Sequence, residues 1–494
     1  MCGICGIIQP AISEPEFGAM RRALRHRGPD ADGQYFHGPV ALGHQRLKII
    51  DLSEAARQPM TNEDGTLVIV FNGEIYNFQP LRAELEQHGH KFRSRSDTEV
   101  IVHGYEQWGA QCVERFNGMF AFAIHDQKRR EVFLARDPLG IKPLYYYATA
   151  GAFLFASEIK AFLNCAAFKR ELNEDALNEY LLYRSLAGNT TLFRNVHCVR
   201  PGHWLRVRED LTFTEQQYWD VRFDGEPPAD VLAKLTESVA LQEISDVPIG
   251  AQLSGGTDSS LVTALMAQRA KSPIKTFSVG FPETEYSELA YAKIAAEHLR
   301  TDHHEILVRH EQFSDALDDL TWQQDEPLTH ANSAGIYWLC REAKPIVTVL
   351  LTGEGADETF AGYYRYEWLR KSMLAKRWLF PAAPFLPANS RDHRLRRLRN
   401  ALTNSPQDLI VTSTANGLPA FSAHVDPAPV IAKRAGILAP TQSQDWLTQA
   451  LYYDLKTYLP PILRRHFQTV RREWFVWNLP PTFLFAATDP RSAT

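Results

Sequence analysis

The chain contains no long run of apolar residues. No stretch reaches the roughly 18 residues that a membrane-spanning helix needs, and the N-terminus lacks the basic leader and apolar segment of a signal peptide. Its 494 residues include six widely scattered cysteines, which is not typical of a disulfide framework. A net charge of −5 gives no general attraction for nucleic acid or anionic membranes. We therefore expect a cytoplasmic protein that binds neither.

The length exceeds what one hydrophobic core supports, so we expect several domains. The pattern is rich in strands up to about residue 165 and alternates helices with apolar strands from residue 229. A polar run with two prolines, Asp224-Gly225-Glu226-Pro227-Pro228, marks the best boundary. The expected parts are residues 1–165, a connecting segment 166–228, residues 229–460 and a tail 461–494.

Closely spaced strands with few helices predict stacked antiparallel sheets in the first part. The expected strands are Ile4–Ile8, Val40–Ile50, Leu67–Phe71, Met119–His125, Glu131–Ala135, Tyr145–Ala148 and Phe153–Ala156. Helices are expected over Gln79–Gln87, Asp97–Trp108 and Asp175–Tyr183, and loops at 27–30, 72–74 and 136–143.

The second half alternates helix and strand, which predicts a parallel sheet with helices on both faces. The expected strands are Ile249–Leu253, Ile274–Phe281, His303–Leu307 and Ile346–Leu351, and the helices 230–244, 258–270, 286–299 and 333–343. Because neighbouring strand residues point to opposite faces, His303 and His304 cannot chelate one ion, and we interpret them as structural.

Cys2 follows the initiator methionine directly. Removal of Met1 would place a thiol and an α-amine on one residue, and an amine that titrates near about 8 can act as the base for the thiol. A small buried thiol is the alternative. The sequence Cys2-Gly3-Ile4-Cys5 also matches a redox or zinc motif, but it lacks the helix start or the second ligand pair that those sites need.

A glycine-rich loop lies between an expected strand and an expected helix, in the sequence Leu253-Ser254-Gly255-Gly256-Thr257-Asp258-Ser259-Ser260. Its backbone N–H groups, its hydroxyls and the helix N-terminus suit a phosphate or pyrophosphate, and a carboxylate there suits Mg²⁺. The loop is neither a Walker loop nor a dinucleotide fingerprint. A capped glycine turn is the alternative.

A second loop has the same placement after a strand, Thr352-Gly353-Glu354-Gly355-Ala356-Asp357-Glu358. Glu354 and Asp357 are three apart and would share a face of a short helix. Paired acids beside phosphates suit Mg²⁺ binding or a base. A capped helix start is the alternative.

Together these motifs resemble one family. Cys2-Gly3-Ile4, Arg27-Gly28-Pro29-Asp30, Arg46-Leu47, Asn72-Gly73-Glu74-Ile75-Tyr76-Asn77 and Ser96-Asp97 are similar to a class II glutamine amidotransferase domain. Such domains are N-terminal-nucleophile hydrolases with four αββα layers. The loops 254–260 and 353–358 resemble the PP-loop ATP pyrophosphatase half of glutamine-hydrolysing asparagine synthetases, an α/β domain with a parallel sheet.

The resemblance implies that Cys2 attacks the glutamine carboxamide and that Asn72 and Gly73 form the oxyanion hole. The implied glutamine-binding residues are Arg46, Leu47, Lys48, Ile49, Ile50, Asn72, Gly73, Glu74 and Asp97. Within this set, Arg46 would pair with the substrate carboxylate, and Glu74 with Asp97 would hold its ammonium. An arginine on the surface and an Asn-Gly hairpin turn are the structural alternatives.

The resemblance also implies the cofactors ATP and Mg²⁺. The implied ATP-binding residues are Leu253, Ser254, Gly255, Gly256, Asp258, Ser259, Val279, Thr352 and Gly353. Asp258 and Asp357 would bind Mg²⁺, and Glu354 would assist formation and capture of a β-aspartyl-adenylate. The implied partners are glutamine, aspartate and ATP, and a homodimer is compatible with the resemblance.

The chain departs from the family pattern after Tyr458-Leu459-Pro460, and no lysine follows Lys456. We therefore expect a competent glutaminase half and an impaired synthetase half. The expected function is glutamine-dependent asparagine synthesis. The alternatives are amidation of another carboxylate and a catalytically reduced regulatory paralogue.

Overall fold

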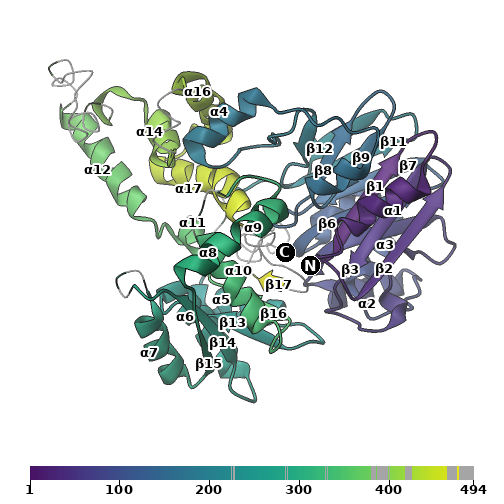
Figure 1. The fold of residues 1–494 in the computed structure, drawn as a ribbon, viewed down its shortest axis with the longest axis horizontal. Coiled ribbons are helices and arrows are strands. Elements are labelled where there is room, and N and C mark those ends of the chain that lie inside the picture. The colour runs from purple at the N-terminus through teal and green to yellow at the C-terminus, as the bar shows by residue number, and fades with distance from the viewer. Residues whose placement is uncertain are drawn as a thin grey trace. The chain divides into compact units, whose positions relative to one another are not determined.

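The computed structural model describes residues 1–223, 225, 228–283, 285, 287–328, 330, 332–379, 385, 399, 401–417, 425–463 and 475–477. These residues form two compact units (Figure 1). One unit contains residues 1–172, 193–354 and the described residues from Leu463 onward. The other contains residues 173–192 and 355–462. No helix among the described residues is long and apolar enough to cross a membrane.

The first unit begins with two six-stranded antiparallel sheets. The first sheet has the order β10-β8-β9-β1-β3-β2, with β1 Gly3–Ile8, β2 Ala31–His37, β3 Val40–Arg46, β8 Tyr145–Ala148, β9 Phe153–Ala156 and β10 Val196–Cys198. The second has the order β12-β11-β7-β6-β5-β4, with β4 Met60–Thr61, β5 Leu67–Ile75, β6 Gly118–Asp126, β7 Glu131–Arg136, β11 His203–Arg208 and β12 Phe213–Gln217.

Apolar side chains on both faces of each sheet produce the layered packing. Ile4 and Leu42 of the first sheet join Val70 and Ala123 of the second in the central core. The outer faces are covered by helical segments: α1 Glu14–Arg22 and η3 Ile159–Asn164 on one side, and α2 Phe78–Gln87, α3 Asp97–Trp108 and η2 Gly109–Arg115 on the other. A short turn, η1 Glu54–Ala56, precedes β4. The expected αββα architecture is confirmed.

The structure corrects two expected strands that flank the site. The strand expected over Val40–Ile50 ends at Arg46. The strand expected over Leu67–Phe71 continues to Ile75, and the segment 72–74, expected to be a loop, pairs with β6. Asn-Gly favours a turn locally, but here β6 supplies a partner for every residue of β5.

Three strands and one helix fall within the segment that was expected to connect the domains. Strands β10, β11 and β12 add to the edges of the two sheets, and α4 Glu174–Tyr183 belongs to the second unit. The strands β10 and β12 are short or mostly exposed, so their apolar pattern is weak.

The first unit also contains a parallel sheet of order β15-β14-β13-β16-β17. Its strands are β13 Ile249–Gln252, β14 Lys275–Gly280, β15 Asp302–Leu307, β16 Val349–Leu351 and β17 Phe475–Trp477. Its helices are α5 Val231–Gln242, α6 Thr257–Arg269, α7 Leu289–Leu299, α8 His310–Asp315, α9 Leu317–Gln324 and α10 Asn332–Ala343. The remaining tail residues after Leu463 lie outside the described residues.

The order of this sheet places a switch point between β13 and β16. The chain runs outward from β13 to β14 and β15, and then returns to the other side of β13 as β16. Open α/β sheets bind ligands at the carboxyl ends of strands at such a point. His303 lies 2.9 Å from the Thr276 hydroxyl through Nδ1, and His304 stacks on Phe277, which agrees with structural roles.

The second unit is helical. Its elements are α4, α11 Ala356–Phe360, α12 Tyr364–Leu379, α14 Pro406–Ser413, α16 Pro427–Ala435, η6 Gly436–Thr441 and α17 Trp446–Thr457. Leu369, Ile410 and Tyr453 are fully buried in its apolar core. Beside them, Arg434 donates to the Glu179 carboxylate at 2.8 Å and lies over the Tyr183 ring. This buried pair joins α4 to α16.

We expect Arg434→Met to destabilise the helical unit by about 3–5 kcal/mol, because the buried Glu179 carboxylate loses its buried partner. Lys433 contacts the same carboxylate at 2.8 Å from a half-exposed position. Lys433→Met is therefore the control and should cost less than about 1 kcal/mol. Urea denaturation followed by circular dichroism measures both. Equal losses would contradict the role assigned to the Arg434 pair.

Candidate active site

Cys2 directly precedes β1 and is held through its backbone. Arg27 Nε donates to the Cys2 carbonyl at 2.9 Å, and Arg27 also donates to Glu158 Oε1 at 2.7 Å. Glu158 is fully buried and receives a second cation, Lys160. The neighbouring Ile4 N–H donates to the Ser157 hydroxyl at 3.0 Å. The position of Cys2 therefore depends on a network of buried charges.

The Cys2 thiol is a neutral group in this environment. Burial raises its pKa, although Arg46 and Arg27 oppose that shift, and Sγ donates to the Leu47 carbonyl at 3.7 Å. Burial also lowers the pKa of the Met1 α-amine well below its usual value. In a chain that retains Met1, this amine is therefore largely unprotonated beside an un-ionised thiol.

Two polar side chains of β5 carry buried atoms without partners. Asn72 and Glu74 are two residues apart and share one face of the strand. Both side-chain polar atoms of Asn72, and Oε2 of Glu74, have no hydrogen-bond partner among the residues that the structure describes. Buried polar groups are almost always hydrogen-bonded, so these atoms are typical of a site built for a ligand.

The N–H of Gly73 points toward the free edge of β5. Phe71 N–H donates to Gln58 Oε1 at 2.6 Å, and Ile75 N–H donates to Asp97 Oδ2 at 2.9 Å. Since alternate residues of a strand direct their N–H groups to the same edge, Gly73 N–H lies between those two and points away from β6. A Cβ at Gly73 would approach the Met119 carbonyl oxygen to 2.2 Å, so only glycine fits.

Glu74 and Asp97 form a buried acidic pair. Burial raises the pKa of Glu74 well above its usual value, and the charge of Asp97 adds to the rise. Burial likewise raises the pKa of Asp97 to about 6, against hydrogen bonds that stabilise its carboxylate. Two carboxyl groups whose charge is disfavoured by burial provide a place for a cation.

Arg46 adopts a different role in this structure from the expected substrate contact. Its guanidinium donates to the backbone carbonyls of Ile50, Asp51 and Ser53, and so orders the loop after β3. The neighbouring predicted residues Leu47 and Ile49 are buried in this loop, whereas Lys48 pairs with Glu54. The segment Arg46–Ile50 thus forms one side of the Cys2 site.

The sequence analysis missed Lys142 and Glu158. Lys142 is fully buried, its pKa is lowered to about 7 chiefly by burial, and its charge interacts with Glu74 and Cys2. Lys142 Nζ and Arg27 both donate to the Met1 sulfur, at 3.5 and 3.7 Å. The only local signal was a charged residue within a mostly apolar stretch, and such a signal does not reveal a partner more than a hundred residues away.

The loop after β13 is folded around its own hydroxyl groups. Ser254 N–H donates to the Ser259 hydroxyl at 3.1 Å, and Gly256 N–H donates to the Ser254 hydroxyl at 3.2 Å. Gly255 has φ of +81°, and a Cβ there would approach the Tyr291 and Ala292 backbone to about 2.4–2.5 Å. Helix α6 starts at Thr257, which directs its first N–H groups into the loop.

The loop after β16 lies beside the start of α6. A Cβ at Gly353 would approach Ser259 N to 2.8 Å, so the two backbones are in close contact. Thr352 is buried, and Glu354 N–H donates to its hydroxyl at 3.4 Å. Val279, near the end of β14, lies at the same edge of the sheet. Asp357 lies in the first turn of α11, in the other compact unit.

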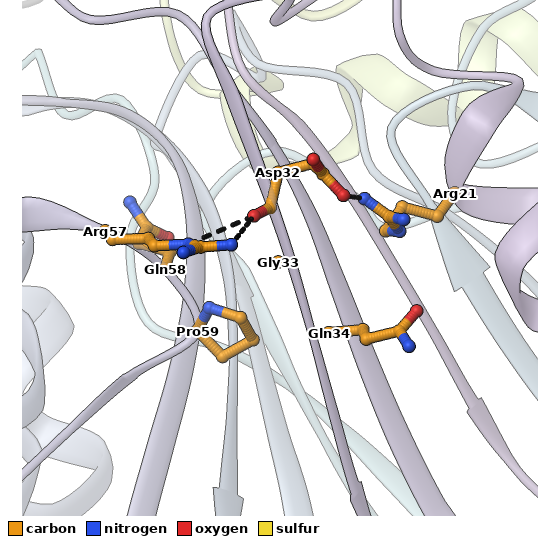
Figure 2. Close-up of a pocket in the computed structure, with 7 residues that line it drawn as sticks. All are labelled: Arg21, Asp32, Gly33, Gln34, Arg57, Gln58 and Pro59. Carbon is orange, nitrogen blue, oxygen red and sulfur yellow. Dashed lines mark hydrogen bonds and ion pairs between the residues drawn. The ribbon is translucent and has the colours of Figure 1, made fainter. Parts of the chain in front are cut away.

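A separate cavity of about 450 Å³ lies on β2 and the segment before β4 (Figure 2). It is lined by Arg21, Asp32, Gly33, Gln34, Arg57, Gln58 and Pro59. Figure 2 shows Asp32 between two guanidinium groups, with Arg57 donating to its carbonyl and Arg21 paired with its carboxylate. None of the residues predicted from the sequence lines this cavity.

Comparison with known proteins agrees with the two halves of the chain. A glutamine amidotransferase domain matches residues 1–219, and an asparagine synthase domain matches residues 230–472. The first unit therefore contains the N-terminal-nucleophile amidotransferase fold and the parallel sheet of the asparagine synthase domain, while residues 355–462 of that domain belong to the second unit.

Three relatives illustrate the similarity. The chain is 38% identical to asparagine synthetase (glutamine-hydrolyzing) 1 of Bacillus subtilis, over 74% of this chain and 59% of the relative. It is 35% identical to a putative asparagine synthetase (glutamine-hydrolyzing) 2 of Methanocaldococcus jannaschii, over 75% of this chain and 78% of that protein. It is 34% identical to the amidase chry2 of Gibberella zeae, over 69% of this chain and 54% of that protein. The chain belongs to the glutamine-hydrolysing asparagine synthetase family.

We expect Asp97→Asn to stabilise the protein at neutral pH. The raised pKa means that the folded state holds the proton of Asp97 more tightly than the unfolded state, so stability falls as pH rises from about 4 to about 6. The neutral amide avoids this loss, and the gain should reach about 2–3 kcal/mol at pH 7.5. Urea denaturation at pH 4.5 and 7.5 measures it. Asp64→Asn, at an exposed position, is the control and should show no comparable gain in stability. An equal gain for Asp97→Asn at both pH values would contradict this account.

Proposed function

We propose that this chain hydrolyses glutamine at Cys2 and uses the ammonia in an ATP-dependent amidation of aspartate to asparagine. The observation that carries the first half is the set of unpartnered buried atoms of Asn72 and Glu74 near the Cys2 thiol. The chain spans 59% of the Bacillus subtilis relative and 78% of the Methanocaldococcus jannaschii relative. The proposal of the complete reaction therefore rests on the residues of this chain.

In the proposed hydrolysis, removal of Met1 leaves the α-amine on Cys2. The amine takes the thiol proton, the sulfur attacks the carboxamide carbon, and the proton passes to the departing ammonia. Asn72 Nδ2 and the Gly73 N–H donate to the oxyanion that forms. Water then cleaves the thioester and releases glutamate, with the amine again acting as base.

The rest of the site would recognise the amino-acid end of glutamine. Glu74 and Asp97 would bind the substrate α-ammonium, which favours their ionised forms and offsets the effect of burial. Arg46 would pair with the α-carboxylate of glutamine after giving up one of its hydrogen bonds to a backbone carbonyl of the loop. The segment Leu47–Ile50 would line the bound glutamine.

The synthetase half would bind ATP where the loops after β13 and β16 meet. The backbone N–H groups of residues 254–256 and the start of α6 suit the pyrophosphate, and Val279 with Thr352 and Gly353 would line the nucleotide. Asp258 would bind Mg²⁺ beside the phosphates, since this ion prefers hard oxygen ligands. Asp357 stays a Mg²⁺ ligand predicted from the sequence resemblance alone. Glu354 would act where the acceptor carboxylate is adenylated.

A second acceptor is favoured by one observation. A protein called an amidase is among the relatives, so related chains are not all named for asparagine synthesis. An ATP–pyrophosphate exchange assay with a panel of carboxylic acids decides between the acceptors, because exchange without aspartate dependence would favour another acid. An impaired synthetase half, a homodimer and a cytoplasmic location stay predictions from the sequence.

We expect Cys2→Ala to abolish glutamine hydrolysis and to spare ammonia-dependent synthesis, because only the donor half uses the thiol. Cys5→Ala is the matched control, since Cys5 is buried in the same strand and burial raises its pKa to about 12. The assay measures ammonia release from glutamine. Intact-mass analysis of the same protein determines the state of its N-terminus. Retained hydrolysis in Cys2→Ala would overturn the proposal.

We also expect Asn72→Ala to lower kcat for glutamine hydrolysis roughly a hundred- to a thousandfold, the usual effect of losing an oxyanion donor. The unfolding midpoint should stay the same or rise, because the buried amide has no partner to lose among the described residues. A loss of activity that follows a loss of stability would instead indicate a structural role.

A further inference from the structure

Four side chains on the outer side of the amidotransferase half converge without a ligand role in the proposed reaction. Glu63 lies in the turn before β5, His90 lies in the loop between α2 and α3, and His103 and Glu106 lie one turn apart on α3. One ligand atom from each lies within 4.8 Å of the others. These four residues are called the His–Glu cluster below.

The His–Glu distances in the cluster are close to the edges of a coordination tetrahedron. His103 Nδ1 lies 3.3 Å from Glu63 Oε2 and 3.8 Å from Glu106 Oε2. His90 Nδ1 lies 3.7 Å from the other oxygen of Glu63, Oε1, and 3.7 Å from Glu106 Oε2. Zinc at about 2.0–2.1 Å from each ligand would set its ligands about 3.3–3.4 Å apart. Binding of all four atoms to one ion would therefore shorten separations that now extend to as much as 4.8 Å.

His103 supplies a second, independent indication. Its side chain is only 1% exposed, yet neither ring nitrogen makes a hydrogen bond among the described residues. Nε2 lies 3.7 Å from Glu99 Oε1, and Nδ1 faces Glu63 in the cluster. His90 Nε2 lies 3.2 Å from Gln107 Oε1, and a proton donated there leaves the Nδ1 lone pair directed at the cluster. The ring of His103 is held by an edge contact with Phe92.

From this geometry we propose that Glu63, His90, His103 and Glu106 bind a divalent transition-metal ion, Zn²⁺ being the best fit. Two imidazole nitrogens disfavour Ca²⁺ and Mg²⁺, which take oxygen ligands, while two carboxylates balance the charge of a dication. The ion would join the turn before β5 and the α2–α3 loop to α3. Since α3 begins at Asp97, the metal would fix the helix that presents this carboxylate to the Cys2 site.

The experiment uses the full chain without a histidine tag, stripped with a chelator and dialysed. Titration calorimetry with Zn²⁺ alone should show one ion per chain with micromolar or tighter affinity, and Co²⁺ should give the visible absorption of a tetrahedral site. The unfolding midpoint should rise with Zn²⁺, because the ion binds the folded state. No binding at one ion per chain would overturn the proposal.

Variants locate the site. His103→Ala should weaken Zn²⁺ binding by at least about a hundredfold, more than the usual loss from removing a supporting contact. Because His103 is buried, His90→Ala and Glu106→Gln test the same site from more accessible positions, and each should abolish the Zn²⁺-dependent shift of the midpoint. His88→Ala, an exposed histidine two residues from His90, is the matched control and should bind normally. Unchanged binding in His90→Ala and Glu106→Gln would overturn the assignment.

Discussion

The buried carboxylate of Glu158 is the group on which the arrangement of the Cys2 site depends. A buried charge requires partners, and Glu158 obtains them from Arg27 and Lys160. Arg27 also donates to the Cys2 carbonyl, so the ion pair that neutralises Glu158 also fixes the backbone of the proposed nucleophile. Lys160 in turn pairs with Asp325, which extends the network to the end of α9. Loss of Glu158 would leave the buried guanidinium of Arg27 without its carboxylate partner, whereas Lys160 would keep Asp325.

Both proposed reactions rely on backbone N–H groups that strands and helices place in advance. In the first half, antiparallel pairing with β6 directs Gly73 N–H toward the free edge of β5. In the second half, the switch point between β13 and β16 brings a helix start and a glycine turn together. Donors of this kind need no reorganisation when negative charge develops or binds. The shared requirement explains why Gly73, Gly255 and Gly353 each approach other backbone atoms too closely for a side chain.

The sequence predicted those parts of the sites that depend on local order. Cys2 at the chain start and the loop after β13 were recognisable because strand, loop and helix follow each other directly. Asn72–Glu74 was placed in a loop because Asn-Gly favours turns, whereas the deciding partner, β6, lies far along the chain. Lys142 and Glu158 were missed for the same reason, since pairing of buried charges across many residues leaves no periodic pattern. The His–Glu cluster likewise draws on three separated segments.

The burial of Met1 carries a consequence for the synthesis of the protein. In the folded chain this residue is only 3% exposed and its sulfur accepts from two cationic side chains. An aminopeptidase needs access to the first residue and its peptide bond, and the burial of Met1 restricts that access. In the proposed hydrolysis the α-amine belongs to Cys2, so removal of Met1 would have to precede this burial. A molecule that folded with Met1 in place would lack the base on which the proposed reaction depends.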